Sequence, residues 1–308
     1  MSLQYTILKM ISRIICLFPY RFVLKLGKAL GHVYYYAAAK QRCRALQQIK
    51  ESLALSDSEA ETIIRSLFIK LGQTFAEVMY MPALTKESIR QHVAIENIEY
   101  LQDAVQQAKG VVFLTAHVGN WEWLGARLAM EGFPMTSVIK RQPNDQHTQI
   151  LNEYRQMVGI EIFARGTTEL IGAAKALKQG KVLGFLADQD AGPNGVFLEF
   201  LGKKASTPSG PAVFARKFKC PIIPTFIVRR PEGGHRIIVH PPVTIQEMAT
   251  EAETIRHMTQ NLASITEDFI KQYPDEWLWF QKRWNTRYEP LAVEHTAPVN
   301  GGKAGETV

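Results

Sequence analysis

The 308-residue chain is poor in cysteine, and its three cysteines stand far apart with no Cys-x-x-Cys pair (Cys16, Cys43 and Cys220). This spacing argues against a disulfide framework or a zinc site and fits a reducing compartment. Signatures of nucleic-acid-binding modules are missing too, so we expect no nucleic acid among the partners. The net charge of +7 then favours anionic lipid or an acidic protein as a partner.

A long uncharged apolar run is also missing. Residues 1–39 are strongly apolar, but cationic residues recur through them (Lys9, Arg13, Arg21, Lys25 and Lys28). The uncharged stretches between them fall short of the roughly 18–20 residues of a spanning helix, and they do not form a signal peptide. We predict one or two helices that lie in the membrane interface, with lysine and arginine at the headgroups. The alternative is a pair of ordinary core helices.

No linker rich in proline, glycine or serine divides residues 1–290, and no internal repeat is visible. The sequence therefore predicts N-terminal interfacial helices over 1–40 and one folded domain over 41–290. Residues 291–308 lose all hydrophobic periodicity and are small and polar, which is typical of a disordered tail.

Short apolar runs alternate with helical patterns from about residue 93 onward. The runs predict strands at 93–96, 111–116, 135–139, 182–187, 222–228 and 236–239. Helical spacing is found at 58–80, which starts with a capping box at Ser56, and at 97–108, 121–131, 145–158, 168–179, 208–218 and 251–273. This alternation predicts an α/β fold whose central sheet is mostly parallel or mixed and flanked by helices.

One histidine stands where such folds place their chemistry, beyond the carboxyl end of a strand. The apolar run 111–116 leads into His117-Val118-Gly119-Asn120-Trp121-Glu122, in which Gly119 and Asn120 permit a tight turn before a helix. A histidine can take the proton of an attacking alcohol, and a carboxylate on its other nitrogen selects the tautomer. Glu122 can reach the ring across the turn, but a purely structural histidine is the alternative. No Gly-x-Ser-x-Gly motif supplies an enzyme nucleophile.

The block 117–122 resembles the HFGNWE block of the lipid A biosynthesis (lauroyl/myristoyl) acyltransferase family, whose wider group carries His, four residues and an acid. Further blocks over roughly residues 20–288 are similar in the same order: 139–144 (IKRQPN), Arg155 with Gly159, Arg165-Gly166, 186–190 (LADQD), 197–202, 207–212 (TPSGPA), Ile223-Pro224 with Arg229-Arg230, and 277–284 (WLWFQKRW). Val118 and Leu201 replace a usual phenylalanine. Trp277 and Trp279 are either core residues or part of an interfacial aromatic belt.

The resemblance implies a glycerolipid-acyltransferase-like fold and assigns site roles. His117 is the general base, and Glu122 orients it. Arg155 and Arg165 are candidates to stabilise the oxyanion or to hold an acceptor phosphate, and Arg141 is a further candidate. Surface solvation is the alternative for each arginine.

Two further residues, Asp188 and Asn120, complete the candidate oxyanion or substrate site. Asp188 ends a buried-type strand, so it either positions a substrate hydroxyl or an arginine, or caps the following turn. The family needs neither a metal nor another cofactor, and we expect none, because His, Asp and Glu here lack tight ligand spacing.

The implied activity of residues 41–290 is transfer of a fatty acyl chain from acyl carrier protein to a hydroxyl of a lipid A precursor. We expect this to occur at the cytoplasmic face of the inner membrane. An acceptor such as a glycosylated phosphatidylinositol is an alternative. A non-catalytic membrane-binding protein is a second alternative, which the intact His117 and Glu122 disfavour.

Overall fold

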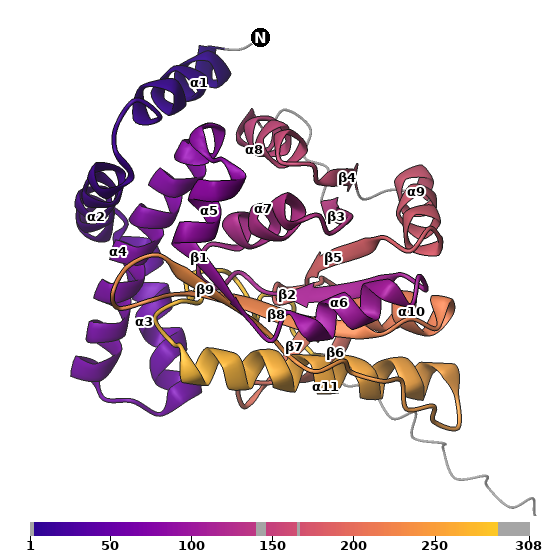
Figure 1. Cartoon of the computed structure of the whole chain (residues 1–308). Coiled ribbons are helices and arrows are strands. Elements are labelled where there is room, and N and C mark those ends of the chain that lie inside the picture. Colours follow the sequence, from indigo (N-terminus) through magenta and orange to yellow (C-terminus); the bar gives the residue numbers. More distant parts are fainter. Residues whose placement is uncertain (1–2, 140–145, 165–166, 289–308) are drawn as a thin grey trace, which may run out of the picture.

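The computed structural model describes residues 3–139, 146–164 and 167–288 (Figure 1). Its strands are β1 (Val93–Glu96), β2 (Val111–Thr115), β3 (Met135–Ile139), β4 (Glu161–Ala164), β5 (Val182–Leu186), β6 (Val196–Phe200), β7 (Lys203–Thr207), β8 (Ile222–Arg229) and β9 (His235–Val239). Its helices are α1 (Leu3–Ile15), α2 (Tyr20–Ala37), α3 (Ala39–Leu53), α4 (Asp57–Tyr80), the short 3-10 turn η1 (Met81–Ala83), α5 (Lys86–His92), α6 (Glu99–Gln106), α7 (Trp121–Glu131), α8 (Gln146–Met157), α9 (Thr167–Lys178), α10 (Gly210–Phe218) and α11 (Glu251–Gln272). The tail predicted at 291–308 lies outside the described residues.

The described residues form a seven-stranded sheet with the order β1-β9-β8-β2-β5-β3-β4. The strands from β8 to β4 run parallel, whereas β9 is antiparallel to β8 and carries β1 parallel to itself. This confirms the predicted α/β fold with a mostly parallel, mixed sheet. All six predicted strands are present with ends shifted by a residue or so.

Strand β2 lies at the centre of the sheet, and each of its residues is buried. Val111 and Phe113 pack in the cluster that contains Trp123 of α7. Val112 and Leu114 pack in another cluster with residues of α9, α10 and α11. Burial on both faces explains why the sequence shows a continuous apolar run here rather than an alternating one.

Strand β4 and the antiparallel β6–β7 hairpin were not predicted from the sequence. β4 has four residues, too few for a clear periodicity. The hairpin turns at Leu201 and Gly202, whose φ angles of 49° and 74° are left-handed. Leu201 is an unusual residue for this conformation, so the turn carried no recognisable sequence signal.

The N-terminal segment forms two helices, α1 and α2, which lie at the edge of the molecule in Figure 1. Helix α2 packs along α4, the long helix whose predicted capping box at Ser56 is present. None of the helices within 3–139, 146–164 and 167–288 combines the length and apolarity that crossing a bilayer demands.

Candidate active site

His117 lies two residues beyond β2, at the carboxyl edge of the sheet. Its neighbour in space is Asp188, two residues beyond β5. These strands are adjacent and parallel, with Thr115 opposite Leu186, so equal steps past the two strand ends bring the two side chains together. The distance in sequence between them is 71 residues.

Asp188 contacts both the ring and the backbone of His117, through one carboxylate oxygen each. His117 Nδ1 lies 2.8 Å from Asp188 Oδ1, and the His117 backbone N–H donates to Oδ2 over 3.0 Å. Trp277 Nε1 also donates to Oδ2, at 2.8 Å. Burial alone would raise the pKa of Asp188, but the His117 ring and these N–H donors hold the pKa well below its ordinary value. The carboxylate is therefore ionised and accepts a hydrogen bond from a protonated Nδ1.

The second ring nitrogen of His117 faces a more open space. Its Nε2 lies 3.3 Å from the side-chain nitrogen of Gln189, and the side chain is 17% exposed. With the proton on Nδ1, assigned here from the hydrogen bond to Asp188, Nε2 carries a lone pair. This geometry makes Nε2 able to accept a proton from a substrate hydroxyl.

Glu122 does not occupy the position that the sequence suggested. The structure gives the orienting contact on Nδ1 to Asp188, while Glu122 binds Arg155 of α8. Arg155 Nε donates to Glu122 Oε2 over 2.7 Å and Nη2 donates to Oε1, which Trp121 Nε1 also reaches at 3.1 Å. Because Glu122 stands on the first turn of α7, it meets α8 rather than the ring. The prediction that Glu122 orients His117 is therefore corrected: Asp188 contacts the ring, and Glu122 binds Arg155.

A cavity lies between α7 and the strands β2, β3 and β5, with an empty volume of about 480 Å³ that includes its mouth. Its lining includes Glu122 and Arg155 as the charged pair. The other lining residues are Phe113, Thr115, Trp121, Leu124, Gly125, Met135, Thr136, Ser137, Ile160, Gly184 and Leu186. Trp121 is part of this lining and its ring centroid lies 5.0 Å from that of His117, so this largely apolar space lies beside the histidine.

Asn120 is fully buried and serves the turn itself. Its Oδ1 accepts from the backbone N–H of Trp123, which caps α7, and its Nδ2 donates to Glu77 Oε2 over 2.9 Å. Both ends of the amide are thus used inside the protein rather than toward a substrate. Arg141 and Arg165 lie outside the described residues.

The C-terminal segment that contains Trp277 and Trp279 packs against the turn at residues 117–120, between β2 and α7. The N–H of Leu278 donates to His117 O at 3.2 Å, and Trp277 pairs with Val118 in an isolated β-bridge. Both tryptophans are fully buried, which confirms the core alternative over an interfacial belt.

Several site residues were not recognised from the sequence. Gln189 and Trp277 belong to blocks that the resemblance had identified, but their spacing gave no indication that they contact the His117–Asp188 pair.

Within the described part of the chain, no three His, Cys, Asp or Glu side chains gather in a way that would hold a metal ion.

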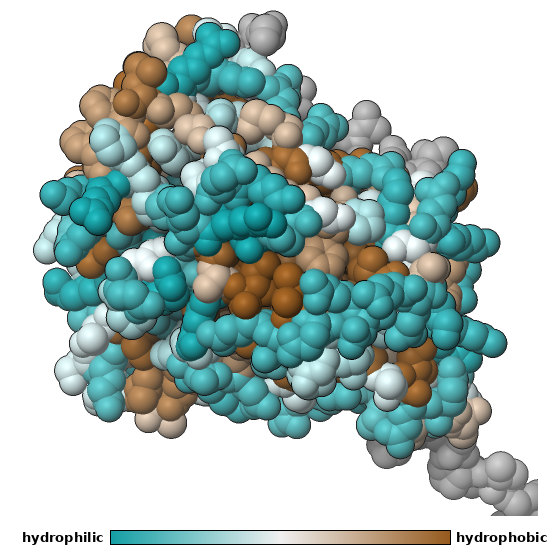
Figure 2. Space-filling model, viewed as in Figure 1, coloured by the Kyte–Doolittle hydropathy of each residue, from teal (hydrophilic) through white to brown (hydrophobic). Residues whose placement is uncertain are grey.

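The outer faces of α1 and α2 expose many large apolar side chains: Leu3, Ile7, Met10, Ile11, Ile14, Leu17, Phe18, Phe22, Leu30, Val33, Tyr34 and Tyr36. Figure 2 shows brown and tan atoms gathered over these helices at its upper left. Arg13, Arg21, Lys25 and Lys28 are exposed on the same two helices. We call this surface the α1–α2 face.

Residues 3–286 match the sequence family of bacterial lipid A biosynthesis acyltransferases. The chain is 24% identical over 278 residues to the phosphatidylinositol mannoside acyltransferase of Mycolicibacterium smegmatis, covering 86% of this chain and 88% of that one. It is 25% identical over 276 residues to the lipid A biosynthesis lauroyltransferase of Escherichia coli, covering 88% of each. The lipid A biosynthesis myristoyltransferase of Escherichia coli is 24% identical over 237 residues, 75% of this chain and 71% of that one.

Proposed function

Because the chain belongs to the bacterial lipid A biosynthesis acyltransferase family, we propose that this acyltransferase moves a fatty acyl chain from an acyl carrier protein thioester to a hydroxyl of a lipid A precursor. The observation that carries the proposal is the His117–Asp188 pair, whose Nδ1 is held by an ionised carboxylate while Nε2 is accessible. That is the arrangement a general base for alcohol attack requires.

The acceptor hydroxyl takes the place of the Gln189 amide at His117 Nε2. As its proton passes to Nε2, the oxygen attacks the thioester carbonyl carbon and a tetrahedral oxyanion forms. The carbon–sulfur bond then breaks, and the departing thiolate takes the proton from the imidazolium. Asp188 remains ionised throughout and stabilises the imidazolium. No enzyme-bound acyl intermediate is needed.

Glu122 and Arg155 form the charged end of the cavity beside the histidine. We assign the apolar lining, with side chains such as Phe113, Leu124 and Ile160, to the acyl chain. Arg155 stays fixed on Glu122, so its role is to shape this end and to direct positive charge toward the developing oxyanion. Arg141 and Arg165 follow β3 and β4 in sequence, and we keep both as candidates for an acceptor phosphate.

The α1–α2 face supports a site at the membrane surface. Exposed apolar side chains beside exposed lysine and arginine side chains are the features of a helix that lies in an anionic interface. We propose that this face rests on the cytoplasmic leaflet of the inner membrane, where the acceptor lipid resides. The net charge of +7 favours encounter with an acidic carrier protein.

A glycosylated phosphatidylinositol is the alternative acceptor. It is favoured by the similarity to the mycobacterial phosphatidylinositol mannoside acyltransferase, which covers 88% of that relative. Both acceptors present a sugar or acyl hydroxyl on an anionic lipid, so the same base would serve either.

Purified protein in phosphatidylglycerol vesicles tests the proposal with radiolabelled acyl groups on carrier protein or on coenzyme A. The acceptors are a lipid A precursor, a phosphatidylinositol mannoside and phosphatidylglycerol alone. Labelled lipid A precursor formed from the carrier-protein donor is the expected product. Product only with phosphatidylinositol mannoside transfers the assignment to that acceptor. Absence of labelled lipid with every pair contradicts the proposed function.

A further inference from the structure

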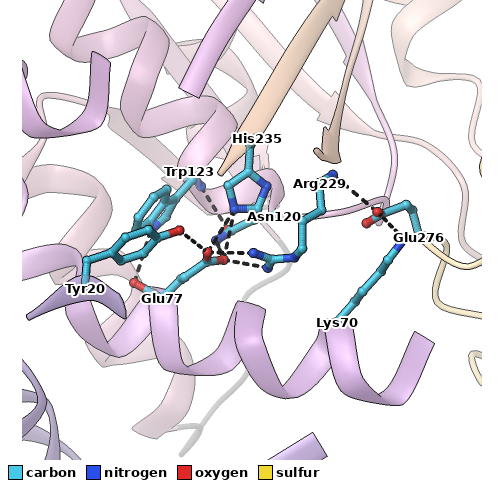
Figure 3. Close-up of polar contacts among 8 residues, drawn as sticks. All are labelled: Tyr20, Lys70, Glu77, Asn120, Trp123, Arg229, His235 and Glu276. Atoms are coloured by element: carbon cyan, nitrogen blue, oxygen red, sulfur yellow. Dashed lines mark hydrogen bonds and ion pairs between the residues drawn. The ribbon is translucent and has the colours of Figure 1, made fainter. Parts of the chain in front are cut away.

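Figure 3 shows a second buried carboxylate cluster. It includes Arg229 of β8, on one side of β2, whereas Asp188 follows β5 on the other side of β2. At the centre of the cluster is Glu77 of α4, which is fully buried. Its carboxylate accepts from Tyr20 Oη at 2.7 Å, Asn120 Nδ2 at 2.9 Å, and Arg229 Nη1 and Nη2 at 2.9 and 2.8 Å. His235 Nε2 lies 3.0 Å from Oε1.

The Glu77 carboxylate carries a full charge in this site. Burial alone would raise the pKa of Glu77, but His235 and Arg229 hold the pKa well below its ordinary value. A buried carboxylate is stable only when its oxygens accept hydrogen bonds, because an unpaired charged oxygen costs more free energy in the low-dielectric interior than in water. The donors around Glu77 are therefore held in a fixed arrangement, and one of these donors is Asn120.

Glu276 extends the cluster to the other end of the turn. Its Oε1 accepts from Lys70 Nζ at 2.6 Å and from the Arg229 backbone N–H at 3.2 Å, and its backbone carbonyl accepts from the N–H of Gly119 at 3.0 Å. Gly119 has a φ of 59° and lies so close to Ile227 that a Cβ there would collide with its carbonyl oxygen. The turn thus has no room to relax on this side.

The Glu77 carboxylate also connects the turn to the α1–α2 face, because it accepts a hydrogen bond from Tyr20. Tyr20 is the first residue of α2, and Glu77 lies near the end of α4. The two helices touch backbone to backbone, because a Cβ at Gly27 would lie 2.6 Å from the Cα of Gln73 and a Cβ at Gly72 would meet Gly31. Because densely packed interiors transmit strain, we expect a shift of α2 to reach Glu77.

We propose that Glu77 is a positioning residue for the reaction: by holding Asn120 it sets the turn that presents His117 to Asp188, and by holding Tyr20 it links that turn to the α1–α2 face. Glu77 does not touch substrate and acts only through the turn. This inference rests on the proposed function, in which His117 is the base.

The sharpest test is Asn120→Ser. Serine is as good an N-cap as asparagine, so α7 keeps its start, but the shorter side chain cannot reach Glu77. We expect kcat to fall about tenfold with KM changed less than twofold, since small displacements of a catalytic group mainly slow the chemical step. Thr250→Ser, an N-cap exchange in α11, is the matched control and should leave kcat unchanged.

A spectroscopic readout makes the test independent of turnover. In the wild-type protein with ¹⁵N-labelled histidine, the Nδ1 proton shared by His117 and Asp188 gives a downfield proton resonance. We expect Asn120→Ser and Tyr20→Phe to shift or broaden this resonance. Tyr80→Phe, whose ring packs against Tyr20, is the control and should leave it in place.

A wild-type kcat in Asn120→Ser together with an unchanged downfield resonance overturns the positioning role. A rise in KM at constant kcat also overturns it, because Asn120 would then contact substrate directly. If the wild-type protein transfers no acyl group, the proposed function fails, whereas the resonance still reports whether Glu77 sets the geometry of His117.

Discussion

Two histidine–carboxylate pairs lie on either side of the same turn, and they differ in what the second ring nitrogen meets. His117 binds Asp188 through Nδ1 at 2.8 Å, and His235 binds Glu77 through Nε2 at 3.0 Å. The His117 side chain is 17% exposed with Nε2 near Gln189, whereas His235 is fully buried and its Nδ1 has no hydrogen-bond partner in the described structure. Pairing with a carboxylate is thus common to both, and access of the free ring nitrogen is what distinguishes His117, the proposed base, from His235.

The comparison also separates the roles of charge. Around Glu77, a full positive charge from Arg229 balances the carboxylate inside the protein. Asp188 instead accepts hydrogen bonds from His117 and from the neutral N–H of Trp277, while the buried Arg283 acts on it electrostatically but donates its hydrogen bonds to Ser206 and Thr207. The Glu77 carboxylate thus accepts hydrogen bonds from a cation in the resting protein, whereas under the proposed function Asp188 does so only when His117 is protonated.

The largest effect is expected from removing the free ring nitrogen of His117, and the comparison with His235 tests whether access of that nitrogen is what matters. His117→Asn keeps a side-chain nitrogen near Asp188 and loses Nε2, so kcat should fall about a thousandfold, within the range of general-base catalysis. His235→Gln keeps a nitrogen near Glu77 and loses the unpartnered Nδ1 together with the ring contact to Trp123. It should reduce kcat far less. Initial rates with labelled acyl donor measure both, and comparable losses in the two variants would end the distinction drawn here.

Asp188→Asn is expected to lower kcat about a hundredfold or more, because the ring loses both its tautomer control and the charge that stabilises the imidazolium. Asp190→Asn is the matched control, since Asp190 binds Thr286 rather than the histidine. Circular dichroism should show both variants folded. Full activity in Asp188→Asn would return the orienting role to another residue.

Glu77→Gln should act on stability first. It removes the carboxylate that pairs with the buried Arg229 guanidinium, and breaking such a pair costs roughly 3–5 kcal/mol. Because the folded pKa of Glu77 is depressed, its stabilisation is present above the ordinary value of 4.5 and is lost as pH falls toward the folded pKa. Denaturant unfolding should therefore show a gap between wild type and variant at pH 7 that narrows below pH 4.5.

Glu99→Gln, on the exposed side of α6, is the control for this measurement. It should leave unfolding unchanged at both pH values. A gap for Glu77→Gln that widened on acidification would mean that the carboxyl group is protonated in the native protein.

The smallest effect is expected on the α1–α2 face. Leu17, 82% exposed, and Phe22 would each contribute at most about 1.5–3 kcal/mol on entering lipid. We expect Leu17→Asp with Phe22→Asp to weaken binding to phosphatidylglycerol vesicles at least tenfold in a sedimentation assay. Met248→Asp, at an exposed methionine elsewhere, should bind as wild type does. Unchanged binding of the double variant would place membrane contact elsewhere.

Much of the fold could be predicted from local pattern. The apolar runs and helical spacings identified six strands and the principal helices, and the capping box at Ser56 located the start of α4. Strand β4 and the β6–β7 hairpin escaped because they are short and their turn lacks the usual residues. The candidate base, His117, was found because a buried run followed by Gly-Asn marks the end of a strand.

The partner of that base could not be found in the same way. Glu122 is five residues from His117, and proximity in sequence made it the apparent partner. Asp188, 71 residues away, is the residue in contact. Nothing in a local pattern states that β2 and β5 are neighbours, since strand order depends on how the intervening helices cross the sheet.

The sequence by itself determined the elements, the turn that exposes a histidine, and an N-terminal segment that is both apolar and cationic. Only the tertiary structure decided which acid holds the ring, that Glu122 binds Arg155 instead, and that Glu77 holds the turn from the other side. The physical reason is that periodicity and turn chemistry act between near neighbours along the chain. Hydrogen bonds between buried side chains depend on strand order and helix packing, which bring distant residues together.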